Sequence, residues 1–115
     1  MGTGGTGVVT SPGFQAIAPC TSESAFVTGA VVTLRADGQG FFPACVRLAS
    51  GGTVVFQGSF HDHPLQSRAL GTNPSPILGT NFGGAVEYEF SNPGVYTYGC
   101  AAHPNEIGVV WASTQ

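Results

Sequence analysis

The chain is divided into short runs of β-branched and aromatic residues by clusters of glycine, proline, asparagine and serine. Eighteen glycines and eight prolines occur among its 115 residues, and no long stretch has the 3.6-residue period of an amphipathic helix. The clearest run is 85–90, AVEYEF, in which apolar and acidic residues alternate. Other predicted strands cover 30–36, 44–49, 53–58, 95–100 and 108–112, and one short strand lies near Ile77 within a long connection over 63–84. We therefore predict an all-β fold, a Greek-key β-sandwich of about seven to eight strands.

A chain of this length is sufficient for one domain with a hydrophobic core, but not for two. We assign residues 15–115 to a single domain and residues 1–14, rich in glycine and threonine, to a flexible N-terminal segment. That segment lacks the charged and apolar regions of a signal peptide, so we expect any export signal to lie upstream of this sequence.

Charged residues are scarce. Three arginines, no lysine and six acidic residues give a formal net charge of -3, so there is no basic patch to bind nucleic acid. No apolar run approaches the roughly 20 residues that a membrane-spanning helix needs. We therefore expect neither a nucleic-acid partner nor a membrane span.

Three cysteines leave an odd thiol. In a cytosolic protein Cys20 and Cys45 would be free thiols. In a small, lysine-free chain rich in glycine and proline we favour a Cys20–Cys45 disulfide and an exported protein. Cys100 is then unpaired, and in an oxidising compartment it needs protection by burial or by a metal.

The segment YGCAAHPNEIGVV, residues 98–110, places Cys100, His103 and Glu106 at three-residue intervals beside predicted strands. A buried thiol, a surface histidine and a solvated glutamate can be neighbours without a shared role. A metal site would explain all three, but it needs another ligand. The remaining histidines, His61 and His63, both follow the predicted strand 53–58 and can supply one.

The donor types indicate which chemistry is possible. A thiolate and two imidazoles suit copper, with an axial position for a weaker fourth ligand. Zinc would accept the same atoms together with Glu106 as a tetrahedral set. A Cys–His hydrolase would need an oxyanion hole as well, and nothing beside Cys100 indicates a helix N-terminus or a substrate cleft. We therefore expect a metal site.

Residues VYTYGCAAHPNEIGVVWA resemble the C-terminal ligand loop of the cupredoxins, the type 1 blue-copper family, and are most similar to its amicyanin-like and plastocyanin-like members. In that family a Cys and a His from this loop bind copper, and a second His comes from the end of an earlier strand. The segment GGTVVFQGSFHDHPL resembles that earlier strand, and His63, followed by Pro64 and Leu65, matches the family position better than His61. The resemblance covers roughly residues 30–112.

The chain departs from the family pattern at three positions. Glu106 stands where amicyanin-type loops have the axial Met, and Met1 is the only methionine. Pro64 replaces the Asn whose side chain usually ties the two ligand loops together, and Ala101 stands where Thr or Ser often follows the Cys. The resemblance therefore implies a metal site of His63, Cys100 and His103, with Glu106 as the axial ligand.

These implications lead to one expected function and three alternatives. We expect one copper ion per chain, one-electron transfer rather than enzymatic turnover, a redox partner protein, a periplasmic or extracellular location, and a monomer in preference to an oligomer. One alternative is a copper site with an open coordination position that binds or converts NO or O2, which would be similar to nitrosocyanin. The others are a copper carrier and a structural module that holds zinc.

Overall fold

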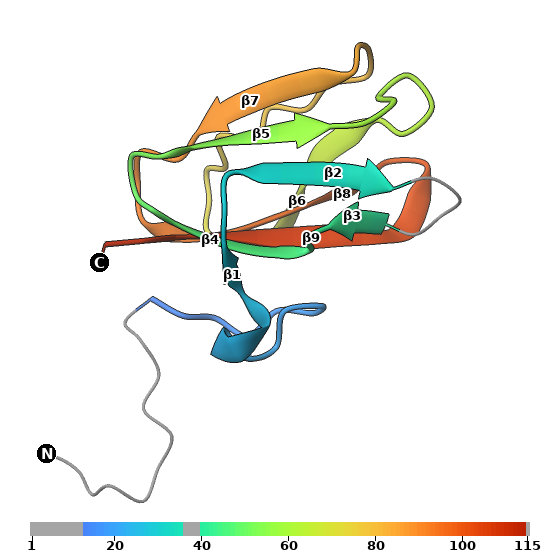
Figure 1. Cartoon of the computed structure of the whole chain (residues 1–115). Helices are drawn as coiled ribbons and strands as arrows, with labels where there is room; N and C mark the ends of the chain where they lie inside the picture. The colour runs from blue at the N-terminus through green and yellow to red at the C-terminus, as the bar shows by residue number, and fades with distance from the viewer. Residues whose placement is uncertain (1–12, 36–39, 115) are drawn as a thin grey trace, which may run out of the picture.

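Two β-sheets face each other in the computed structural model, which describes residues 13–35 and 40–114 (Figure 1). The larger sheet has the order β1-β4-β9-β8-β6 and the smaller has the order β3-β2-β5-β7. The strands of the larger sheet are β1 (Val27–Thr28), β4 (Cys45–Ala49), β9 (His103–Ser113), β8 (Gly94–Cys100) and β6 (Leu65–Gly71). Those of the smaller sheet are β3 (Gly40–Phe42), β2 (Val31–Arg35), β5 (Thr53–Gln57) and β7 (Ala85–Glu89), and a 3-10 turn, η1, covers Glu23–Ala25.

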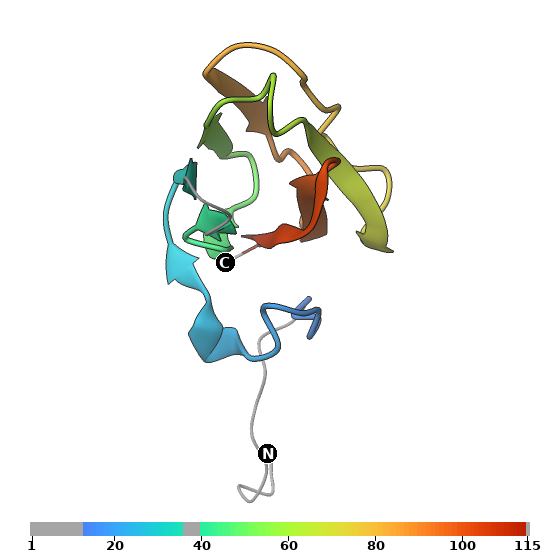
Figure 2. The ribbon, with the colours of Figure 1, turned by 90° about the vertical axis from the view of Figure 1, so that its right-hand side faces the viewer.

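Figure 2, turned by 90° from Figure 1, shows the two layers from one end of the sandwich. In the larger sheet β9 pairs in parallel with β4 and antiparallel with β8, which in turn pairs antiparallel with β6. In the smaller sheet β5 pairs in parallel with β2 and antiparallel with β7. Strands β8 and β9 therefore form a long hairpin at the centre of the larger sheet.

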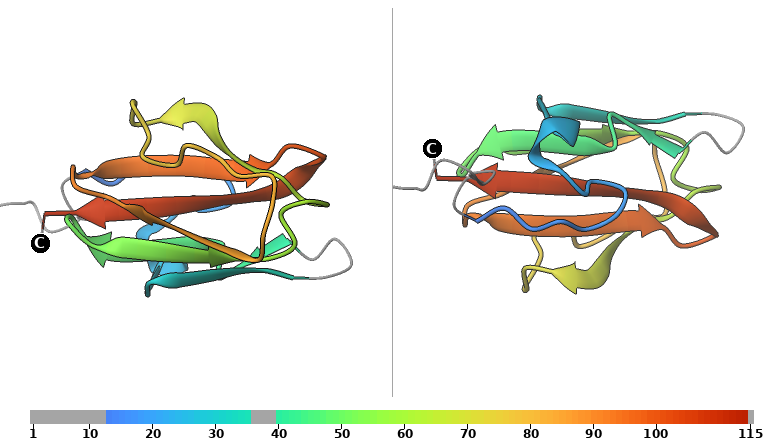
Figure 3. Two further views of the ribbon diagram at one scale, coloured as in Figure 1. Left: turned by 90° about the horizontal axis from the view of Figure 1, so that it is seen from above. Right: turned by 90° about the horizontal axis from the view of Figure 1, so that it is seen from below.

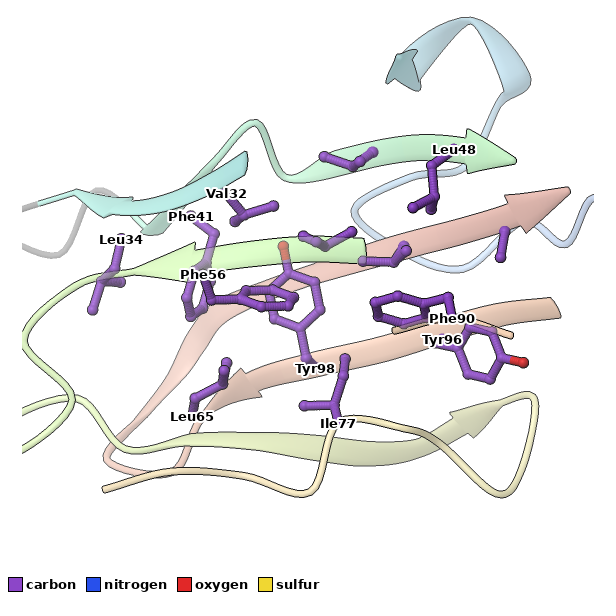
Figure 4. Packing of buried hydrophobic residues seen from close by; sticks show 14 of the residues in the cluster. Val32, Leu34, Phe41, Leu48, Phe56, Leu65, Ile77, Phe90, Tyr96 and Tyr98 are labelled. Atoms are coloured by element: carbon purple, nitrogen blue, oxygen red, sulfur yellow. The ribbon is translucent and has the colours of Figure 1, made fainter. Parts of the chain in front are cut away.

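Aromatic side chains fill the space between the sheets (Figure 4). The ring of Tyr98, on β8, meets the rings of Phe41 and Phe56 edge to face, with centroids 4.9 Å apart in each pair. Such pairs contribute about 0.5–1.5 kcal/mol beyond the area that they bury. Tyr98 has room because its partner across the ladder is Gly108, where a Cβ would overlap the Tyr98 hydroxyl oxygen.

The outer face of the larger sheet is covered by the segment that precedes β1 (Figure 3, right). There the ring of Trp111 packs against Phe14 and Phe26, with centroids 5.5 and 5.4 Å away. The Cys20–Cys45 disulfide joins this segment to β4. Because β9 is covered on both faces, its residues form the near-continuous apolar run GVVWA rather than an alternating pattern.

The predicted all-β sandwich and the predicted disulfide are confirmed. The described residues form nine strands, whereas seven to eight were predicted. The difference arises because β1 and β3 have only two and three residues, which is too short for a strand pattern to be recognised in the sequence. No strand lies at Ile77; the strand of the 63–84 connection is β6, over Leu65–Gly71. Backbone pairing with β8 forms that strand, since its sequence LQSRALG has little β propensity.

Three further observations concern the limits of the domain. Phe14, assigned to the flexible segment, belongs to the cluster around Trp111, while residues 1–12 lie outside the described part. Position 36, the last of the predicted strand over 30–36, also lies outside the described residues. No helix among the described residues is long and apolar enough to cross a membrane.

Replacing both Cys20 and Cys45 with alanine should lower the free energy of unfolding by roughly 3 kcal/mol, because the disulfide closes a loop of 25 residues. Denaturant unfolding of the metal-free protein measures this change. Alkylation of unfolded, non-reduced protein followed by mass spectrometry should label one thiol, Cys100. Three labelled thiols would contradict the disulfide.

Candidate metal centre

The β8–β9 hairpin carries three of the four candidate ligands. Strand β8 ends at Cys100 and β9 begins at His103, so only Ala101 and Ala102 connect them. The last predicted strand covers 108–112, and it leaves His103 and Glu106 in the preceding loop. Both are instead part of β9, because their backbone pairs with β8 beyond the apolar run.

The ladder between β8 and β9 changes register next to these residues. Gly99 pairs with Ile107, but the next residue of β8, Cys100, pairs with His103. Three residues of β9 are therefore accommodated in a bulge, which is a common way to redirect a side chain at a sheet end. Glu106 is the last residue of this bulge, and its carboxylate is turned inward, with no exposed area.

His63 comes from the connection between the two sheets. Strand β5 of the smaller sheet ends at Gln57, and the chain then turns through residues 58–64 into β6 of the larger sheet. Leu65, the first residue of β6, pairs with Cys100. The backbone N–H of Ala101 donates to the carbonyl of Pro64 at 2.8 Å, so a backbone hydrogen bond joins the two segments that carry the candidate ligands.

The ligand atoms of His63, Cys100, His103 and Glu106 all lie within 4.8 Å of one another. Oε1 of Glu106 is 3.0 Å from Nδ1 of His63 and 3.3 Å from Nδ1 of His103. Sγ of Cys100 is 3.5 Å from Nδ1 of His103 and 3.8 Å from Nδ1 of His63. Both imidazoles thus direct the same type of nitrogen toward the thiol and the carboxylate.

Burial divides the four residues into two pairs. Glu106 is fully buried and Cys100 is 4% exposed, whereas the side chains of His63 and His103 are 23% and 45% exposed. Burial raises the pKa of the Cys100 thiol and the neighbouring Glu106 raises it further, while backbone N–H groups of Ala102 and His103 act in the opposite direction. A metal ion that binds this sulfur as a thiolate must therefore displace its proton.

The donor set fits a metal cation. Oε2 of Glu106 is buried and has no hydrogen-bond partner among the described residues, and no Lys or Arg forms an ion pair with this carboxylate there. Burying a carboxylate is costly unless it is paired or coordinates a metal. One thiol, two imidazole nitrogens and one carboxylate directed at a common point form a donor set that transition metals accept.

The structure separates the two histidines of the 59–63 turn. The side chain of His61 is 88% exposed, and its Nδ1 lies 3.3 Å from Oδ1 of Asp62, which is itself exposed. His61 therefore lies outside the cluster, and His63 lies within it. Sequence reasoning identified all four clustered side chains but not the amides of Ala102 and His103 that face the thiol, since backbone groups leave no residue-type signal.

Neither a protein-family model nor a curated protein sequence matches the chain. Several solved structures, however, are similar to this chain. The novel purple cupredoxin from Nitrosopumilus maritimus is 26% identical, with a TM-score of 0.54, and the match covers 74% of this chain and 100% of that chain. The chain has the cupredoxin fold.

Two further structures support this assignment. Pseudoazurin from Methylobacterium extorquens AM1 is 24% identical with a TM-score of 0.61, over 75% of this chain and 76% of that one. Amicyanin from Paracoccus versutus is 20% identical with a TM-score of 0.52, over 73% of this chain and 80% of that one. The expected resemblance to cupredoxins is thus confirmed, while the assignment of the four residues as ligands stays a prediction.

Replacing His63 with alanine should raise the dissociation constant for Zn2+ by more than about 100-fold, because the loss of a ligand exceeds the 10–100-fold cost of losing an outer partner. His61→Ala is the matched control, and it should change the constant by less than about twofold, since His61 faces solvent. Competition with a chromophoric chelator measures both. A larger increase in the dissociation constant for His61→Ala than for His63→Ala would place the ligand at His61.

Proposed function

We propose that this chain is a mononuclear copper protein that transfers single electrons. His63, Cys100 and His103 are the equatorial ligands of one copper ion per chain, and Glu106 is the axial oxygen ligand. The observation that carries the proposal is the cluster of these four donors, two of them buried, at one end of a cupredoxin sandwich. Copper supplies a one-electron couple, Cu(I)/Cu(II), when it is bound.

The donor set favours copper over zinc. A single thiolate with two imidazoles and a more weakly bound fourth ligand is the set associated with mononuclear electron-transfer copper sites, whereas structural zinc sites are commonly built from two or more thiolates. The structural neighbour from Nitrosopumilus maritimus is itself named a purple cupredoxin. We propose that the present chain is likewise a copper-binding cupredoxin. It has a carboxylate rather than a thioether beside its thiol.

The protein contributes a rigid framework. Cys100, His103 and Glu106 are fixed by the β8–β9 ladder, and the Ala101–Pro64 hydrogen bond holds the segment of His63 beside them. A framework that keeps one donor arrangement in both oxidation states requires little reorganisation when an electron is gained or lost. The burial of Cys100 and Glu106 also limits access of exogenous ligands, which supports electron transfer over small-molecule conversion.

Glu106 determines the character of the site. A carboxylate is a hard, anionic donor, and it stabilises Cu(II) more than Cu(I), whereas a thioether is soft and neutral. Because Glu106 is fully buried, its charge is weakly screened by solvent. We therefore expect a lower reduction potential and a weaker copper–thiolate bond than a methionine in this position would give.

The edge around His103 is the proposed contact for a redox partner protein. His103 is the most exposed of the four side chains, and Ala101, Ala102 and Pro104 beside it are exposed and uncharged. Pro64, whose carbonyl accepts from the Ala101 N–H, adjoins this edge and lines a surface hollow together with the exposed side chains of Leu78 and Phe82. An electron would enter or leave through the exposed imidazole edge of His103.

The disulfide supports export. A Cys20–Cys45 bond forms and persists in an oxidising compartment, and Cys100, the remaining thiol, is buried. We propose a periplasmic or extracellular location on this basis.

Replacing Cys100 with serine should abolish the intense visible absorption of the copper-loaded protein, because that band requires charge transfer from thiolate to copper. The visible spectrum of protein loaded with one equivalent of Cu(II) measures it. His61→Ala serves as the control and should keep the band. An unchanged band in Cys100→Ser would contradict the assignment of Cys100, and a colourless copper-loaded wild type would contradict a Cu(II)–thiolate site.

Replacing Glu106 with methionine should raise the reduction potential and shift the visible spectrum toward that of a blue-copper protein. Glu106→Gln should give intermediate values, because it keeps an oxygen donor but removes the charge. Glu87, which is exposed on β7, provides the control variant Glu87→Gln. Potentiometry and absorption at one pH measure both properties, and no change in either would mean that Glu106 is not a ligand.

A further inference from the structure

Of the four clustered residues, only His63 is not fixed by the β8–β9 hairpin. Its turn leaves the smaller sheet at the end of β5 and enters the larger sheet at β6, so its position depends on how the two sheets are held together. Within the turn the N–H of His63 donates to the carbonyl of Ser59 at 2.9 Å. That bond shapes the turn but does not place it relative to Cys100.

The segment 79–84 binds both ends of this turn through the backbone. At one end, N–H groups of Gly58 and Phe60 donate to the carbonyls of Gly84 and Gly83, at 3.0 and 3.1 Å. At the other end, Leu65 and Thr80 exchange two hydrogen bonds, of 2.8 and 3.0 Å. His63 lies between these two points of attachment.

The segment is itself attached to the smaller sheet by a side chain. The N–H of Gly79 donates to the hydroxyl oxygen of Tyr88 at 3.1 Å. Tyr88 lies on β7, is partly buried, and its ring packs against Phe56 in the core, with centroids 6.0 Å apart. The segment thus connects β7 of one sheet to β6 of the other.

Gly79 is required for the close approach to β6. Its φ is +97°, and a Cβ at this position would lie 3.0 Å from the carbonyl oxygen of Leu65. Any other residue would be strained in its backbone and would press against the strand end that follows His63. The sequence therefore favours contact between the segment and β6 at this point.

We infer that residues 79–84, anchored by the Tyr88 hydroxyl, are a positioning segment that sets the place of His63 relative to Cys100, His103 and Glu106. The identity of the ion rests on the proposed function, but the positioning of His63 applies to any metal ion that binds the four donors. Tyr88 forms a hydrogen bond with Gly79 rather than with a donor, and it acts on Leu65 through the backbone hydrogen bonds of the next residue, Thr80.

The test compares two hydroxyl deletions. Tyr88→Phe removes the hydroxyl that anchors the segment. Tyr96, which lies on β8 four residues before Cys100, provides the control, because Tyr96→Phe removes a hydroxyl that donates to the Asn92 carbonyl at 2.7 Å. With Zn2+ as the probe, we expect Tyr88→Phe to raise the dissociation constant about fivefold or more, the scale of one hydrogen bond. Tyr96→Phe should leave it within about twofold.

A metal-free readout separates positioning from general destabilisation. In Tyr88→Phe, amide hydrogen exchange at Leu65 and Thr80 should accelerate relative to wild type, while exchange in β9 should not. Tyr96→Phe should not accelerate exchange at Leu65 and Thr80. Equal Zn2+ affinity in the two variants, or unchanged exchange at Leu65 and Thr80 in Tyr88→Phe, would overturn the inference.

A second pair of variants tests the same segment if Tyr88→Phe does not fold. Gly79→Ala and Gly51→Ala both place a side chain at positive φ, but no atom lies within 4 Å of a Cβ at Gly51, in the β4–β5 turn. Gly79→Ala should weaken Zn2+ binding more than Gly51→Ala does, and equal effects would overturn the inference. These measurements use Zn2+, so they hold even if the wild type binds copper without transferring electrons.

Discussion

The change of register between β8 and β9 is the constraint on which the site depends. A regular ladder would continue Gly99–Ile107 with Cys100 opposite Glu106, and residues 101–105 would lie between this pair. Pairing Cys100 with His103 instead closes the hairpin over two alanines and places three residues in a bulge. The thiol, one imidazole and the carboxylate are thereby brought together by local backbone geometry.

The electrostatic consequence is a buried carboxylate beside two imidazoles and a thiol. Removing such a charge from water costs several kcal/mol unless it is compensated, and the described residues offer it no Lys or Arg. A divalent cation would provide the compensation and would use the unpartnered oxygen as well. In the proposed copper site, the same carboxylate would also favour the higher oxidation state of the ion, so Glu106 would influence both the metal affinity and the reduction potential.

Much of this arrangement could be predicted from the sequence, and the remainder depends on tertiary pairing. Alternating runs such as AVEYEF revealed the sandwich, and the spacing of Cys100, His103 and Glu106 revealed the cluster. Strand β6 was missed, because LQSRALG becomes a strand only by pairing with β8. The proposed roles of Pro64, Gly79 and Tyr88 were missed as well, because they rest on hydrogen bonds that residue types do not reveal: Ala101 N–H to the Pro64 carbonyl, and Gly79 N–H to the Tyr88 hydroxyl.

A crystal structure of the copper-loaded protein, with the ion located by anomalous scattering at the copper edge, tests the proposed coordination most directly. We predict one ion per chain, bonded to Sγ of Cys100, Nδ1 of His63, Nδ1 of His103 and a carboxylate oxygen of Glu106. An ion bonded to His61, or a Glu106 carboxylate turned away from the ion, would contradict the proposed site.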